Sequence, residues 1–272
     1  MRTDPFDPRP PTPDTPDVPS QLLGPFTASQ SYWQTSKTHR YSLLFALPLL
    51  ALYEALAALL PHDPRGGIRN GADVILREAF YAIGGSRGGM LFGICLIGGS
   101  LWLVGRDVHK SGLPTRGSVF AGMAAESAIL ALGFGFVVAA VTARLLALLA
   151  VGAAGADGGV DTMPLSTRLM VSLGAGLYEE LLFRVILVAA IGWIGRRVLG
   201  LFPVVAGLVA VLVGATIFSA FHYVGPYGDP FRVQSFVFRL VAGIFFSALY
   251  LLRGFGITAW THALYDVYLL TG

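Results

Sequence analysis

Hydrophobic residues fill seven stretches of the chain, each close to the length of a helix that crosses a membrane. A spanning helix needs about 20 predominantly apolar residues. The stretches cover residues 41–60, 88–104, 119–151, 169–194, 201–223, 233–252 and 257–270. We therefore predict an all-α fold, a polytopic bundle of about seven transmembrane helices. The third stretch is longer than a span requires, so we expect it to tilt or to continue beyond the membrane.

A shorter segment, residues 71–84, has a different pattern of polar and apolar positions. Its apolar residues alternate at helical spacing with charged ones: Val74, Ile75, Ala79, Phe80 and Ile83 against Asp73, Arg77 and Glu78. This spacing predicts an amphipathic helix at the membrane surface. If the segment crosses the membrane instead, the number of spans becomes eight.

The first forty residues have another composition altogether. Eight prolines lie between Pro5 and Pro25, interleaved with four aspartates. Such a segment cannot bury a hydrophobic core. We expect residues 1–40 to be a disordered, proline-rich tail and residues 41–272 to form the transmembrane helical domain.

The composition agrees with a multi-span membrane protein, because 54% of the residues are hydrophobic and only 13% are charged. Lysine and arginine cluster between the apolar stretches. This bias places the N-terminus and the loops with Arg106, Arg196 and Arg253 in the cytoplasm. No basic stripe with interleaved aromatic residues is visible, which argues against nucleic-acid binding. Cys95 is the single cysteine, so the chain can form neither an internal disulfide nor a cysteine-based metal site.

Two adjacent glutamates, Glu179 and Glu180, lie inside the apolar stretch 169–194. A carboxylate in hydrocarbon is costly unless it is paired, faces a cavity or takes part in chemistry. Residues four apart share one face of a helix, so we expect Glu180 to pair with Arg184. Glu179 points about 100° away and is the candidate general base. The simpler alternative is that both glutamates only pair with arginines and lock the helix packing.

Two histidines also lie in apolar surroundings. His222 ends the stretch 201–223, and His262 lies four residues before Asp266 in the last stretch. That spacing would let the carboxylate of Asp266 orient the imidazole of His262. Each residue alone is compatible with ordinary packing, but together they offer a base for water and donors for a tetrahedral oxyanion. Gly-x-Ser-x-Gly and His-Glu-x-x-His motifs are missing from the sequence, which disfavours a serine hydrolase or a standard zinc protease.

Other charged residues in apolar stretches have simpler interpretations. We expect Glu54 and Glu126 to pair or cap within the bundle. We expect Arg239 to face a cavity or a neighbouring acid. None of these residues is assigned to catalysis.

The charged residues form three motifs that resemble those of the CPBP family, which groups type II CAAX prenyl endopeptidases with bacteriocin-processing and self-immunity proteins. The family motifs are Glu-Glu-x-x-x-Arg, Phe-x-x-x-His, and His-x-x-x-Asn or Asp. Here they run from Glu179 to Arg184, from Phe218 to His222 and from His262 to Asp266. The resemblance covers about residue 169 to the C-terminus, which we therefore expect to be the catalytic half, residues 169–272.

The resemblance implies an intramembrane endopeptidase. The implied roles are water activation by Glu179 with help from His222, an oxyanion site at His262 and Asp266, and retention of Glu180 by Arg184. The implied partners are the lipid bilayer and a membrane-protein or lipidated-peptide substrate. We expect a multi-pass protein of a cell membrane, with a bacterial inner membrane as the location.

Several alternatives remain open from the sequence. Glu179, His222 and His262 would also suit a two-histidine, one-carboxylate zinc site, although the eukaryotic-type relatives are regarded as metal-free glutamate proteases, and we favour that form. Asp266 stands where the prenyl proteases have Asn, and an ionised Asp cannot donate a hydrogen bond to an oxyanion. Outside proteolysis, the chain could be a scaffold or immunity protein that keeps the motifs, or a proton-coupled transporter.

Overall fold

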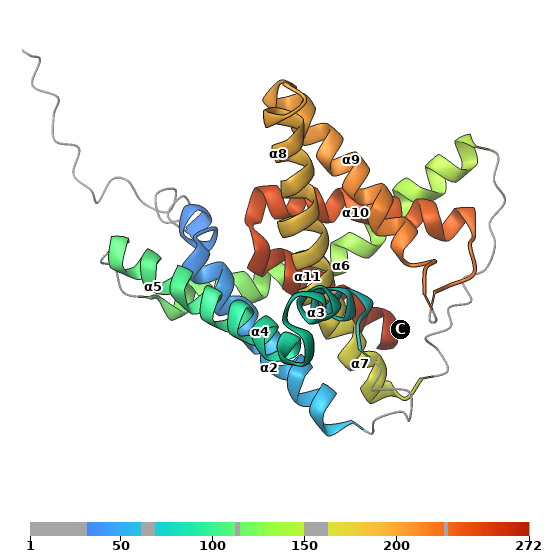
Figure 1. Ribbon diagram of the computed structural model, residues 1–272. Coiled ribbons are helices and arrows are strands. Elements are labelled where there is room, and N and C mark those ends of the chain that lie inside the picture. Colours follow the sequence, from blue (N-terminus) through green and yellow to red (C-terminus); the bar gives the residue numbers. More distant parts are fainter. Residues whose placement is uncertain (1–31, 61–68, 112–114, 150–162, 226–227, 272) are drawn as a thin grey trace, which may run out of the picture.

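The computed structural model describes residues 32–60, 69–111, 115–149, 163–225 and 228–271, and the following account concerns these residues. Within them the chain is helical almost throughout and contains no strand (Figure 1). The prediction of an all-α bundle is confirmed. All seven apolar stretches form helices.

The described helices fall into two halves of the chain. The first half contains α2 (His39–Leu59), α3 (Gly71–Gly84), the short η2 (Gly85–Arg87), α4 (Gly88–Gly93), the π-helical η3 (Ile94–Gly98), α5 (Gly99–Ser111) and α6 (Gly117–Leu148). The second half contains α7 (Leu165–Gly174), the π-helical η5 (Ala175–Val188), α8 (Ala189–Arg197), α9 (Pro203–Phe221), α10 (Val233–Arg253) and α11 (Phe255–Thr271). Two long rods result, because α4, η3 and α5 are continuous and so are α7, η5 and α8.

Five of the described helical stretches are long and apolar enough to cross a membrane: His39–Leu59, Gly71–Lys110, Gly117–Leu148, Pro203–Phe221 and Val233–Arg253. Helix α6 has 32 residues and is about 48 Å long, which exceeds the hydrocarbon thickness of about 30 Å. The rod with the glutamate pair and the 17-residue α11 are not among the five. These two elements carry the first and third motifs, whereas the second motif lies at the end of α9, which is one of the five.

Helix α11 lies at the centre of the bundle. It contacts α2, α6, α7, η5 and α10. Buried residues of α2, α3, α4, η5 and α11 form one hydrophobic core, and those of α6, α10 and α11 form another. Helices α8 and α9 form a hairpin that projects from this centre (Figure 1). The last motif is therefore held on the most enclosed helix of the bundle.

Helix α3 lies where an amphipathic helix was predicted, but its polar face is turned inward. Asp73 is fully buried, while Val74 and Ile83 are exposed. Asp73 forms ion pairs with Arg69 at 2.5 Å and with Arg77 at 2.7 Å. Asp73 and Arg77 therefore satisfy each other's charge inside the bundle. The outward side of α3 carries apolar residues such as Val74 and Ile83 together with the exposed Glu78.

The chain reverses sharply between α3 and α4. Gly85 has a φ of 55°, a conformation that favours glycine. A side chain on Gly88 would lie 2.4 Å from the backbone of Tyr81, so only glycine permits this close crossing. The reversal folds α3 back against α4.

The ordered domain begins before the expected boundary at residue 40, since residues 32–36 already form a helix. The hydroxyl of Tyr32 donates to Glu126 at 2.6 Å, and Arg253 pairs with the same carboxylate at 2.5 Å. Burial and the hydrogen bond to Glu126 raise the pKa of Tyr32 to about 12. The expected pairing of Glu126 within the bundle is confirmed. Residues 1–31 of the expected tail lie outside the described residues.

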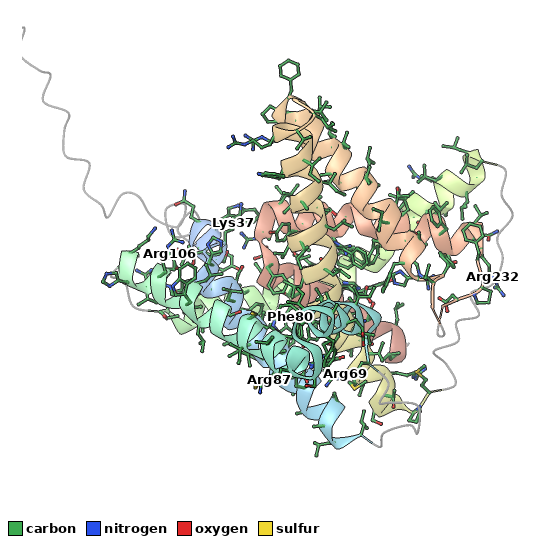
Figure 2. All side chains as sticks on the ribbon, in the orientation of Figure 1. Lys37, Arg69, Phe80, Arg87, Arg106 and Arg232 are labelled. Atoms are coloured by element: carbon green, nitrogen blue, oxygen red, sulfur yellow. The ribbon has the colours of Figure 1, made fainter. Side chains whose placement is uncertain are left out.

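Charged side chains mark the two ends of the α2 and α5 pair. Lys37 and Arg106 lie at one end, and Arg69 and Arg87 lie toward the other (Figure 2). Arg239, as expected, faces a neighbouring acid and pairs with Asp229.

Candidate active site

Glu179, Glu180 and Arg184 lie on η5, the π-helical middle of the second rod. All three are buried, with exposed fractions of 6%, 0% and 1%. A π-helix bonds residue i to i+5, is rare, and is frequently found at functional sites. The helix expected over residues 169–194 is present, but its central turns are wider than the 3.6 residues per turn assumed from the sequence.

Element η5 comes very close to α11 at Gly176. A Cβ atom on Gly176 would lie 2.4 Å from the carbonyl oxygen of Ala259 and 2.6 Å from the Cβ of Ala263. Only glycine allows such an approach. The crossing brings the glutamate pair against the helix that carries His262.

Glu180 joins the first motif to the third. Its Oε2 lies 3.2 Å from Nε of Arg184, which is the expected pair. Its Oε1 lies 2.7 Å from Nδ1 of His262. An ionised carboxylate only accepts hydrogen bonds, so the proton of this bond belongs to Nδ1 of His262.

Asp266 does not orient His262 in the way that the sequence suggested. Its Oδ2 lies 3.6 Å from Nε2 of His262, which is beyond hydrogen-bond length. Glu180 takes the orienting role instead, because η5 and α11 are close enough for its side chain to reach Nδ1. Asp266 lies beside Nε2 of His262, the ring nitrogen that does not bond to Glu180.

Arg184 has an unusual environment for a buried guanidinium. It lies over the rings of Phe218, at 4.3 Å, and Phe246, at 5.5 Å. Among the described residues its N–H groups have an ion-pair partner in Glu180 but no partner in hydrogen-bonding geometry. Buried polar groups without hydrogen bonds are rare and costly. Burial of Arg184 without hydrogen bonds to its N–H groups therefore lowers the stability of the folded protein.

His222 caps the C-terminal end of α9. Its Nδ1 lies 2.9 Å from the carbonyl oxygen of Phe218. A carbonyl can only accept, so Nδ1 carries the proton and, in a neutral ring, Nε2 has a free lone pair. That Nε2 lies 3.9 Å from Oε2 of Glu179. The separation is too long for a direct hydrogen bond.

The three motifs meet at one place. The ring of Phe218 lies 4.9 Å from the ring of His222 and 6.4 Å from that of His262, measured between centroids. The motifs come together because η5 packs against both α9 and α11.

Asn70 belongs to the site but was missed in the sequence. Its Nδ2 donates a hydrogen bond of 2.9 Å to Oε1 of Glu179, and its Oδ1 accepts one of 2.9 Å from the backbone N–H of Ala72. The second bond settles the orientation of the amide, because a backbone N–H can only donate. Asn70 is also the N-cap of α3, and Asn-Gly before a helical pattern was the only signal for it.

Asn70 is held in turn by a set of charged and hydroxyl groups that we call the Asp73 cluster: Tyr53, Glu54, Arg69, Asp73, Arg77 and Tyr178. The hydroxyl of Tyr53 accepts from the backbone N–H of Asn70 and donates to Asp73. Burial opposes the charge of Arg69, but its hydrogen bonds to Glu54 and Asp73 outweigh that effect and raise its pKa above the usual value. The expectation that Glu54 pairs within the bundle is confirmed.

The residues of the alternative zinc site, Glu179, His222 and His262, are not arranged as a metal site in the described ranges. There, no group of three His, Cys, Asp or Glu side chains is placed to hold a metal ion. Bonds of about 2.0–2.1 Å would hold tetrahedral zinc ligands about 3.3 Å apart, whereas Glu179 and His222 are separated by 3.9 Å. The third of these residues, His262, directs one nitrogen to Glu180. This donor set does not fit zinc.

Comparison with known proteins finds a family match over the region that contains the three motifs. Residues 161–268 match the family model described as type II CAAX prenyl endopeptidase Rce1-like. No curated protein and no solved structure matches the chain. The matched range contains all three motifs but excludes Asn70 and five of the six residues of the Asp73 cluster. Residues 161–268 therefore form a domain of the Rce1-like type II CAAX prenyl endopeptidase family, a family of membrane-embedded proteases.

Proposed function

We propose that the chain is an intramembrane endopeptidase in which Glu179 activates a water molecule to attack a peptide bond. The observation that supports this most is the pair of facing acceptors, Oε2 of Glu179 and Nε2 of His222, 3.9 Å apart. One water molecule can donate a hydrogen bond to each. Its oxygen would then be held with a lone pair free to attack a carbonyl carbon.

The reaction needs one proton to move twice. Glu179 takes a proton from the water as its oxygen bonds to the substrate carbonyl carbon, and the carbonyl oxygen becomes an oxyanion. His222 holds the second hydrogen of the water. Protonated Glu179 then gives its proton to the leaving nitrogen, the C–N bond breaks, and the carboxylate is regenerated. Asn70 donates to the other oxygen of Glu179, which leaves Oε2 as the base.

The oxyanion site would lie at the edge formed by His262 and Asp266. With Nδ1 of His262 committed to Glu180, the donor toward the substrate must be a proton on Nε2 or on Asp266. The two atoms lie 3.6 Å apart, so one proton held between them suffices. Glu180 favours a positive charge on His262 and Arg184 balances the charge of Glu180.

The substrate class follows from the site's position within a membrane-type bundle. We propose a peptide bond in a membrane protein or in a lipidated peptide, cleaved without a metal ion. The alternative to this protease is a non-catalytic scaffold or immunity protein, and the test must distinguish the two.

The test is a cleavage assay on the purified, folded protein in detergent or nanodiscs. A farnesylated C-terminal peptide and a transmembrane peptide serve as substrates, with and without a chelator, and bound zinc is measured in parallel. We expect cleavage that the chelator leaves unchanged. Loss of cleavage with the chelator, restored by zinc, would contradict the metal-free mechanism. A folded protein that cleaves neither peptide would favour the scaffold.

A further inference from the structure

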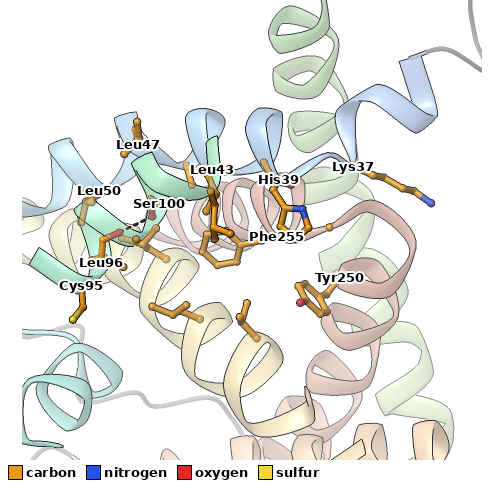
Figure 3. A pocket seen from close by; sticks show the side chains of 18 of the residues that line it. Lys37, His39, Leu43, Leu47, Leu50, Cys95, Leu96, Ser100, Tyr250 and Phe255 are labelled. Atoms are coloured by element: carbon orange, nitrogen blue, oxygen red, sulfur yellow. Dashed lines mark hydrogen bonds between the residues drawn. The ribbon is translucent and has the colours of Figure 1, made fainter. Parts of the chain in front are cut away.

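A cavity of about 640 Å³ lies between α2, α5, η5 and the turn from α10 to α11 (Figure 3). This is within the range of about 300–1,000 Å³ typical of ligand pockets. Leu177, Leu181 and Val185 of η5 form one wall. Of the described residues around the cavity, none belongs to the three motifs, so it is separate from the candidate active site.

The lining changes character from one end to the other. Lys37, His39 and Tyr250 lie at one end, while Leu50 and Cys95 lie at the other (Figure 3). Leucine side chains of α2 line the length between them. The described lining residues include no acidic side chain. The cavity is thus a mainly apolar slot with a cationic end.

The slot has the length of one membrane leaflet. Along α2 its lining runs from His39 to Leu50, eleven residue steps, or about 16 Å at 1.5 Å per residue. The hydrocarbon core of a bilayer is about 30 Å thick, so one leaflet measures about 15 Å. An acyl chain extended along α2 would fill the slot from end to end.

Aromatic and basic residues mark the cationic end as the level of lipid headgroups. Lys37 lies 5.3 Å from the ring of Trp33, and Arg106 lies 5.5 Å from the ring of Trp102. Both tryptophans are exposed, and Lys37 and Arg106 lie at the same end of the bundle (Figure 2). Tryptophan with Lys or Arg is typical of the membrane interface, where the cations attract anionic headgroups.

We propose that this cavity binds one acyl chain of an anionic phospholipid, with the lipid phosphate at Lys37 and His39. The positive charge at the Lys37 end of the cavity favours an anionic headgroup. The length of the slot, about 16 Å, matches one acyl chain in one leaflet. The bound chain packs against Leu181 and Val185, on the same helical element as Glu179. The proposal does not depend on the protease mechanism, because it concerns binding alone.

The unmodified protein offers a first test, since its single cysteine, Cys95, lines the apolar end and is exposed. The rate at which a maleimide alkylates Cys95 is measured in nanodiscs of phosphatidylcholine and in nanodiscs that also contain phosphatidylglycerol. We expect phosphatidylglycerol to slow alkylation. Equal rates in the two lipids would overturn the proposal. Protection by a farnesylated peptide but not by phosphatidylglycerol would also overturn it, and would assign the slot to a substrate lipid.

Two neighbouring glycines provide a matched pair of variants. Gly99 lines the cavity and Gly98 does not, while a Cβ at either meets nothing within 4 Å. Gly99→Phe should weaken phosphatidylglycerol binding, measured by native mass spectrometry, at least about tenfold, since displacing two or three methylenes from the slot already has that effect. Gly98→Phe should bind like the wild type. Lys37→Glu should remove the preference for phosphatidylglycerol over phosphatidylcholine. Equal phosphatidylglycerol binding by Gly99→Phe and Gly98→Phe would show that the acyl chain does not bind in this cavity.

Discussion

At the scale of single residues, the site depends on which atoms carry protons. The carbonyl of Phe218 fixes the proton of His222 on Nδ1, and Glu180 fixes that of His262 on Nδ1. Both imidazoles therefore turn Nε2 toward an acid, Glu179 or Asp266. The acid beside His222, Glu179, also accepts a hydrogen bond from Asn70, and in the proposed mechanism the two histidines have different roles.

Asn70 offers the first prediction. Asn70→Ser keeps an N-cap oxygen for α3 but removes the amide that donates to Glu179. We expect kcat to fall about 10- to 150-fold, which corresponds to the loss of a hydrogen bond to a charged group, worth about 1.5–3 kcal/mol. KM and the melting temperature should change little. Asn70→Ala, which also loses the cap, should lower stability as well. A Ser variant with wild-type kcat would show that the amide has no part in catalysis.

Asp266 offers the second. An amide donates a hydrogen bond at every pH, whereas a carboxyl group donates only while it is protonated. If Asp266 helps to hold the oxyanion, Asp266→Asn should keep cleavage activity and retain it at high pH, where the wild type declines. The pH profile of kcat/KM measures this. Asp266→Ala is the control and should lose activity throughout. An Asn variant as inactive as the Ala variant would count against an oxyanion role.

At the scale of elements, hydrophobic patterning predicted the helices but not their irregularities. The seven apolar stretches all became helices because their length and composition leave few other structures in a membrane. The π-helical turns of η5 were not predictable, since the apolar pattern around Glu179 is compatible with either winding. The inward face of α3 was missed for a related reason. Asp73 pairs with Arg77 on the next turn of the helix and with Arg69 just before the helix, which periodicity alone does not reveal.

The crossing of η5 and α11 gives a prediction at this scale. Gly176→Ala inserts a methyl group 2.4 Å from the carbonyl oxygen of Ala259, so the helices must separate. Overpacking of this kind costs about 1–3 kcal/mol, against a helix-propensity gain of about 1 kcal/mol. We expect a lower melting temperature and reduced cleavage. Gly192→Ala lies on the same rod, where the nearest atom would be 3.7 Å away, and should be neutral or stabilising. Equal behaviour of the two variants would contradict the close crossing.

At the scale of the whole molecule, the first half of the chain completes a site that the second half carries. Asn70 and Glu179 are 109 residues apart. The three motifs could be found in the sequence because their internal spacings match known ones. Asn70 could not, since a single polar residue beside a glycine is common at helix starts and its partner is set only by how α3 folds against η5.

The Asp73 cluster is expected to hold these halves together. Asp73→Asn keeps the volume but removes the charge shared by Arg69 and Arg77. We expect a loss of about 3 kcal/mol in unfolding free energy, the lower end for a broken buried pair, because both arginines are partly exposed and still reach Glu54. Thermal unfolding in detergent measures it. Glu78→Gln, on the exposed side of the same helix, is the control and should unfold like the wild type. A stable Asp73→Asn variant would show that packing alone joins the halves.

The most direct test of water activation by Glu179 is to compare cleavage of a lipidated or transmembrane peptide by the wild type and by Glu179→Gln. The substitution keeps the shape of the side chain but removes the base that activates water. We predict that kcat falls about 10²- to 10⁴-fold, the usual contribution of a general base, with an unchanged melting temperature. Cleavage by Glu179→Gln at the wild-type rate would show that Glu179 is not the base.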